Sequence, residues 1–132
     1  MPNFERAKKW LTFAARDLRT AKALVSLPDP DFYFSSFACQ QSAEKSIKSF
    51  LAFHDQRIFK THKIEQLILL VDQISPETSK LVQDADKLTP YAVAIRYPGA
   101  DILVDKDTTD EAISIAEITY NVIFKSINND NV

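Results

Sequence analysis

The stretch that decides the fold is Phe34–Leu51, FSSFACQQSAEKSIKSFL, which contains neither Gly nor Pro. At about 100° of rotation per residue, one stripe of this helix carries the apolar side chains Phe37, Ile47 and Leu51. Gln40 and Glu44 fall on the same stripe. Burying an unpaired amide costs about 2–7 kcal/mol, and an unpaired carboxylate costs far more. We therefore expect these polar side chains either to meet donors from neighbouring helices or to lie on a face that is not fully buried.

The composition of the chain favours helices throughout. It has 132 residues, of which 45% are hydrophobic, and a single Gly, whereas all-β folds need Gly-rich turns. We predict an all-α fold with one domain over residues 1–132, ordered over about 4–127 and frayed at 128–132. Because the connections are short, we expect an antiparallel up-and-down bundle of about five helices.

Apolar repeats and capping residues predict where the helices lie. We expect helices at about 4–26, 32–54, 61–74 and 76–88, a helical turn at 91–95, and a final helix of about 18 residues. The expected caps are Asp31, Thr61, Ser75 and Thr108. The first helix carries a bundle seam made of Ala7, Leu11, Ala14, Leu18, Ala21 and Val25.

Bulk properties exclude several classes of protein. The net charge of −2 provides no global attraction to nucleic acid or to an anionic membrane. The single cysteine, Cys39, excludes a disulfide within the chain and a zinc–thiolate site, and we expect neither a metal nor a cofactor. No run approaches the ~18 apolar residues of a membrane span, and the N-terminus lacks the apolar run of a signal peptide. We therefore predict no membrane association and a cytoplasmic location.

Several short motifs follow one another in a recognisable order. They are Asp17-Leu18, the string Gln40-Gln41-x-x-Glu44-Lys45-x-x-Lys48, Thr61-His62, Pro90-Tyr91 and Arg96-Tyr97-Pro98-Gly99. In this order and spacing the chain resembles the HEPN domain family over about residues 4–127.

The resemblance implies a fold and two kinds of function. HEPN domains are antiparallel helical bundles, mostly prokaryotic, that commonly homodimerise. Many act as substrate-binding partners of minimal nucleotidyltransferases, and some of these pairs are toxin–antitoxin systems. Others are metal-independent ribonucleases whose signature is an Arg followed, after four to six residues, by a His at the dimer interface.

The chain departs from the ribonuclease signature. Arg96 matches the family's Arg, but the positions for the His hold Asp101, Ile102 and Leu103. Cleavage through the 2′-OH needs a proton acceptor that works near neutral pH, and His is the usual one. Asp is a poor substitute because its ordinary pKa is about 3.9. We therefore assign no catalytic residue and expect a non-catalytic, dimeric accessory protein that binds a nucleotide beside a nucleotidyltransferase.

Two alternatives to this function stay open. One is a toxin-type ribonuclease with a degenerate Arg/His motif, and the other is a purely structural dimerisation module. The basic run Arg57–Lys60 is a weak signal for contact with RNA.

The candidate ligand-binding residues come from the same motifs. A nucleotide or small phosphate is expected to meet Arg96, Tyr97, Gln41, Glu44, Lys45, Lys48 and His62. The alternative is structural. Glu44 and Lys48 can form a local salt bridge at i, i+4, or a buried network can join Gln40, Gln41 and Glu44 to Arg96 or His62. We expect His62 to lie in the first turn of the third helix.

Overall fold

The structure, a computed structural model, describes residues 2–58, 60–94 and 102–130. These residues form helices and no strand. The elements are α1 (Pro2–Val25), α2 (Phe32–Phe53), α3 (Ile64–Ile74), α4 (Pro76–Leu81), the 3-10 helix η1 (Gln83–Leu88), α5 (Tyr91–Ala94) and α6 (Lys106–Asp130). The predicted all-α helical bundle is confirmed.

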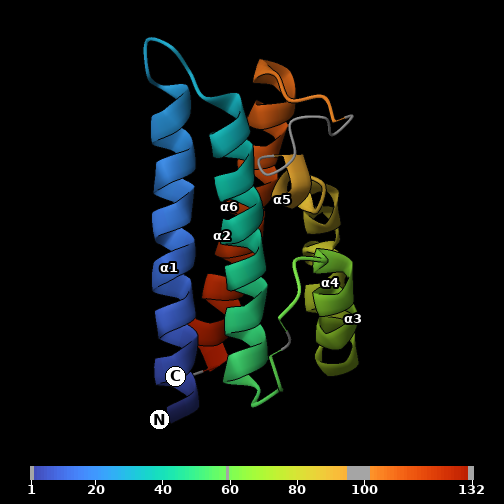
Figure 1. Cartoon of the computed structure of the whole chain (residues 1–132). Coiled ribbons are helices and arrows are strands. Elements are labelled where there is room, and N and C mark those ends of the chain that lie inside the picture. Colours follow the sequence, from blue (N-terminus) through green and yellow to red (C-terminus); the bar gives the residue numbers. More distant parts are fainter. Residues whose placement is uncertain (1, 59, 95–101, 131–132) are drawn as a thin grey trace.

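The three long helices form the main body of the bundle. Figure 1 shows α1 running in the opposite direction to both α2 and α6, so that the start of α1 and the end of α6 lie at the same end. Helix α2 is central, because it contacts α1, α6, α3, α5 and η1. The short helices cover the side of α2 that faces away from α1 (Figure 1). Among the largest fully buried side chains are Ile47, Phe50, Leu51, Ile64, Leu67 and Ile123.

A repeated serine contact joins α1 to α2. The hydroxyls of Ser35, Ser42 and Ser49, all buried, donate to backbone carbonyls of α1 at 2.8, 2.9 and 2.7 Å. Their acceptors are the carbonyls of Ala21, Ala14 and Ala7, respectively. Both sets repeat every seven residues, which keeps one face of each helix against the other. Small side chains on both faces let the two backbones approach closely enough for these bonds.

Two of the predicted caps are confirmed. The carboxylate of Asp31 accepts from the backbone N–H of Phe34 at 2.9 Å and opens α2. The hydroxyl of Ser75 accepts from the backbone N–H of Thr78 at 3.2 Å and opens α4, with Pro76 at the first turn. The helix expected to reach about residue 88 instead ends at Leu81 and continues as the 3-10 helix η1.

The prediction for the start of α6 was wrong by about one turn. The helix begins at Lys106, because the carboxylate of Asp105 accepts from the backbone N–H of Thr108 at 2.9 Å. In return, the backbone N–H of Asp105 donates to Thr108 Oγ1 at 2.9 Å. Thr108 is therefore the third residue of the helix and completes a capping box. The helix also continues through the expected tail as far as Asp130.

The cap predicted for α3 was also wrong. The helix begins at Ile64, and the hydroxyl oxygen of Thr89 accepts from the Ile64 N–H at 3.2 Å. Thr61 instead accepts from the Lys63 N–H and donates to the side chain of Gln66. A residue distant in sequence therefore satisfies the first N–H of α3.

The segment between α2 and α3 doubles back along α2. Asp55 has φ of 57°, a left-handed conformation that Asp tolerates better than most residues, and its carboxylate pairs with Arg6 at 3.1 Å. From this turn the chain returns toward the middle of α2 (Figure 1). This path carries His62 to the side of Glu44, well before the end of α2.

Candidate functional site

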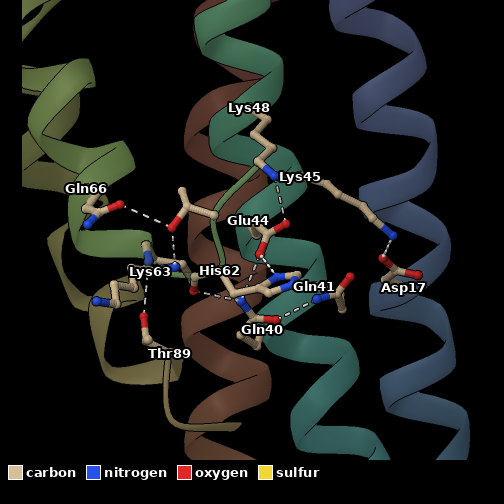
Figure 2. A network of polar contacts seen from close by, with 12 residues as sticks. Asp17, Gln40, Gln41, Glu44, Lys45, Lys48, His62, Lys63, Gln66 and Thr89 are labelled. Atoms are coloured by element: carbon tan, nitrogen blue, oxygen red, sulfur yellow. Dashed lines mark hydrogen bonds and ion pairs between the residues drawn. The ribbon is translucent and has the colours of Figure 1, made fainter. Parts of the chain in front are cut away.

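Glu44 is the centre of a buried polar network on α2. Only 4% of the residue is exposed. Its Oε2 accepts from Lys48 Nζ at 3.0 Å, and its Oε1 accepts from His62 Nδ1 at 2.9 Å and from Gln40 Nε2 at 3.1 Å. Figure 2 shows these donors converging on the carboxylate from two sides. A buried carboxylate needs such compensation, because an isolated one is strongly disfavoured.

Gln40 links Glu44 to the segment that precedes α3. The residue is fully buried, and its Nε2 also donates to the backbone carbonyl of His62 at 3.3 Å. Its Oε1 accepts from Gln41 Nε2 at 2.7 Å. Both ends of the amide are therefore hydrogen-bonded. The expectation that the polar stripe of α2 meets donors from a neighbouring segment is confirmed.

His62 lies at the solvent edge of this network. Its side chain is 48% exposed, and it stands before α3, so the prediction that it belongs to the first turn of that helix was wrong. The Nδ1–H donates to Glu44, since a carboxylate only accepts. The ring therefore spans from the buried carboxylate to solvent.

The two lysines of the motif point toward α1. Lys45 Nζ binds Asp17 Oδ2 at 2.6 Å, as Figure 2 shows. Lys48 Nζ, already paired with Glu44, also lies 5.7 Å from the centroid of the Trp10 ring, within the range of a cation–π contact. Each lysine therefore has a carboxylate partner, and a phosphate at either one must compete with that partner.

Arg96 and Tyr97, the other two candidates, lie outside the described residues. Helix α5, which ends at Ala94, packs against α2. The chain enters α5 at Thr89, whose hydroxyl caps α3.

Cys39 is not a reactive thiol. It is fully buried on α2, and burial raises its pKa to about 12. At neutral pH the thiolate, which is the nucleophilic form, is therefore almost absent.

The described residues contain neither a cluster of metal ligands nor a helix that could span a membrane. Within 2–58, 60–94 and 102–130, no three His, Cys, Asp or Glu side chains are grouped closely enough to hold a metal ion. None of the helices described there combines the length and the apolar character that crossing a membrane requires.

A comparison with protein families decides the relationship. The model of the HEPN domain matches residues 7–127, which contain the whole polar network and the Arg96 motif. The chain belongs to the HEPN domain family. No curated protein and no solved structure matches the chain. The HEPN family includes both nucleotidyltransferase-associated proteins and ribonuclease toxins, and its members commonly dimerise.

In this HEPN domain, both histidines lie away from the Arg96 motif in sequence. His62 binds Glu44, and the ring of His54 packs against Phe50 and Phe53, with ring centroids 4.4 and 5.2 Å apart. Leu103, at one of the positions where the ribonucleases have their His, is exposed.

Sequence reasoning missed two parts of this HEPN domain. One is the serine repeat, although Ser35, Ser42 and Ser49 stand at a visible seven-residue spacing. The other is the contact of Lys48 with Trp10, for which the sequence carries no local signal, because the two residues lie on different helices.

Proposed function

We propose that this HEPN domain is a non-catalytic, homodimeric accessory subunit that binds a nucleotide, or a substrate carrying one, beside a minimal nucleotidyltransferase. The observation that carries the proposal is the sequence after Arg96. Asp101, Ile102 and Leu103 occupy the positions where the ribonuclease members of the family have a His. Without that base the domain retains the phosphate-binding Arg but lacks the group that moves the proton.

The polar network supports a binding role over a catalytic one. The general base of a ribonuclease must reach the 2′-OH of its substrate. His62 already donates to a carboxylate that also holds Lys48 and Gln40. The hydrogen bond to Glu44 of α2 therefore fixes the orientation of the His62 ring.

The same network supports Arg96 as the main phosphate contact. Lys45 and Lys48 are neutralised by Asp17 and Glu44, so a phosphate gains little from either lysine. Arg offers a planar pair of donors that matches phosphate oxygens. We place Tyr97 beside it as a stacking surface for a base, with Gln41 and His62 as polar contacts at the edge of the network.

Calorimetry with ATP and GTP tests the ligand. We expect micromolar-range binding to the intact chain and a loss of at least about tenfold in Arg96→Ala, since a charged hydrogen bond contributes about 1.5–3 kcal/mol. Lys80→Ala, which removes an exposed cation from α4, is the matched control and is expected to bind normally. Absence of binding at millimolar nucleotide, or equal affinity in Arg96→Ala, contradicts the proposal.

An RNA-degradation assay tests the opposite conclusion. Purified protein is expected to leave RNA intact. Degradation that disappears in Arg96→Ala replaces the proposal with the ribonuclease alternative.

The partner and the oligomeric state need their own measurements. Light scattering after gel filtration is expected to give the mass of a dimer. Co-expression with a nucleotidyltransferase encoded beside this chain is expected to yield a stable complex. A monomer that forms no complex with such a partner contradicts the accessory role and the toxin–antitoxin pairing that the family suggests.

A further inference from the structure

A groove runs between α1 and α6, apart from the network described above. Its cavity measures about 370 Å³, within the usual range for a small-molecule site. The described residues that line it come from these two helices: Phe4, Lys8, Leu11, Thr12, Ala15 and Arg19 from α1, and Tyr120, Phe124, Ile127 and Asn128 from α6.

The middle of the groove is apolar. Leu11 and Ile127 are buried and form its floor, and Ala15 leaves open space because its side chain is small. Phe124 is 45% exposed, and its ring lies 5.8 Å from that of Tyr120. A hydrocarbon chain laid here removes apolar surface from water at about 25 cal/mol per Å².

Each end of the groove is polar and carries one cation. Arg19 and Tyr120 lie at one end, and Lys8 and Asn128 lie at the other. Lys8 and Arg19 are separated by about 16 Å along the α1 axis, given a rise of 1.5 Å per residue. Among the described residues, no carboxylate side chain lines the groove. Burial raises the pKa of the Tyr120 hydroxyl, and the charge of Arg19 partly opposes that rise, which agrees with their sharing one end.

Helix α1, one wall of the groove, adds to its positive potential. Helix α1 carries six basic residues and only two acidic ones, whereas the whole chain has a net charge of −2. One of the two, Asp17, is already paired with Lys45. Helix α6, the other wall, carries five acidic and two basic residues, so the positive charge that an anion meets in the groove comes from the α1 side.

We propose that the α1–α6 groove binds an amphipathic anion, namely a carboxylate on an unbranched hydrocarbon chain. The carboxylate lies against the guanidinium of Arg19 and the hydroxyl of Tyr120. The chain lies over Leu11, Ala15 and Phe124.

The lining favours this class over a nucleotide. A base needs several polar partners for its edge. In the part of the chain that the structure describes, the groove offers Thr12 and Asn128 as uncharged polar side chains besides the Tyr120 hydroxyl. The amide nitrogen of Asn128 already donates to the backbone carbonyl of Phe124 at 2.8 Å, and the Thr12 hydroxyl donates to the carbonyl of Lys8 at 2.9 Å. The site uses neither Arg96 nor the Glu44 network, so its test is independent of the proposed function.

Calorimetry with decanoate, kept below the concentration at which it forms micelles, tests the site. We expect saturable binding of one decanoate per chain, and weaker binding of the neutral 1-decanol. Arg19→Gln is expected to weaken decanoate binding about tenfold or more, because it removes a charged bidentate contact. Lys125→Gln, which removes the same charge from an exposed α6 position outside the groove, is the matched control and is expected to bind as the unaltered chain does.

A second variant tests the apolar part of the groove. Ala15→Phe fills the open space and is expected to abolish decanoate binding while circular dichroism and the thermal midpoint stay close to those of the unaltered chain. The proposal is overturned if decanoate fails to bind at millimolar concentration, if Arg19→Gln and Lys125→Gln bind equally, or if AMP binds with an affinity that depends on Arg19 while decanoate does not bind.

Discussion

The two sides of α2 are held by different physical means. Toward α1, the helix presents small residues at seven-residue spacing, and Ser35, Ser42 and Ser49 repeat one neutral hydrogen bond. Toward α3, it presents a single buried carboxylate, Glu44, that collects three unlike donors. The first contact is periodic, so we expect it to tolerate the loss of one member. The second is a network in which each member depends on the others, so we expect it to fail when any one charge is removed.

The largest effect is expected from breaking the ion pair of the network. Glu44→Leu leaves Lys48, whose side chain is almost buried, without its anion, and is expected to lower the free energy of unfolding by about 3–5 kcal/mol. Urea unfolding followed by circular dichroism measures the change.

The double variant Glu44→Leu/Lys48→Met is the control for that experiment. Because it removes both charges and keeps apolar volume, we expect it to recover most of the lost stability. Equal losses in the single and double variants would show that packing, and not the charge, is what Glu44 provides.

A smaller effect is expected from a larger side chain at the contact between α1 and the serine face of α2. Ala14 is fully buried at the close approach of α1 to α2, so Ala14→Leu is expected to cost about 1–3 kcal/mol through overpacking. Ala23→Leu, on the exposed side of α1, is expected to change stability by no more than about 0.5 kcal/mol. Thermal unfolding of the two variants compares them, and a similar effect of both would contradict a tight α1–α2 contact.

The smallest effect concerns a cap outside both interfaces. Hydrogen bonds from Thr108 hold the pKa of Asp105 below its ordinary value. A carboxyl with a lowered pKa in the folded state contributes stability at pH values above its unfolded pKa, about 3.9 for Asp. This contribution is lost as the pH falls through the lower, folded value.

Acid titration of stability checks the cap. Asp105→Asn is expected to remove a small, pH-dependent part of the stability, so that its unfolding midpoint falls less steeply below pH 4 than that of the unaltered chain. Asp107→Asn, an exposed change within the same helical turn, is the control. An unchanged acid profile in Asp105→Asn would contradict the role of the cap.

Sequence reasoning predicted the parts of this fold that depend on local pattern. The apolar seam of α1 is buried at Ala7, Leu11, Ala14, Leu18 and Ala21. Asp31 and Ser75 cap the helices expected of them, because an N-cap acts on N–H groups only a few residues away. The start of α6 was misplaced because Asp105 and Thr108 are both good caps, and propensity alone does not choose between them.

The candidate site was predictable in its composition and only partly in its geometry. Gln40 and Glu44 were conspicuous because polar residues interrupted an apolar stripe. Their partner His62 comes from a segment that runs back along α2 after the turn at Asp55, and no local pattern encodes that path. The groove between α1 and α6 was not predicted, since its lining residues become neighbours only when the two helices pack.

The sequence by itself determined that this chain is an all-α HEPN domain, that Asp31 and Ser75 cap α2 and α4, and that positions 101–103 hold no His. These properties depend on residue identity and short spacing. Only the tertiary structure decided that Glu44 accepts hydrogen bonds from two segments, that both motif lysines have carboxylate partners, and that α1 and α6 leave a groove between them. Charge compensation and open volume depend on distances between atoms far apart in the chain, and those distances exist only after packing.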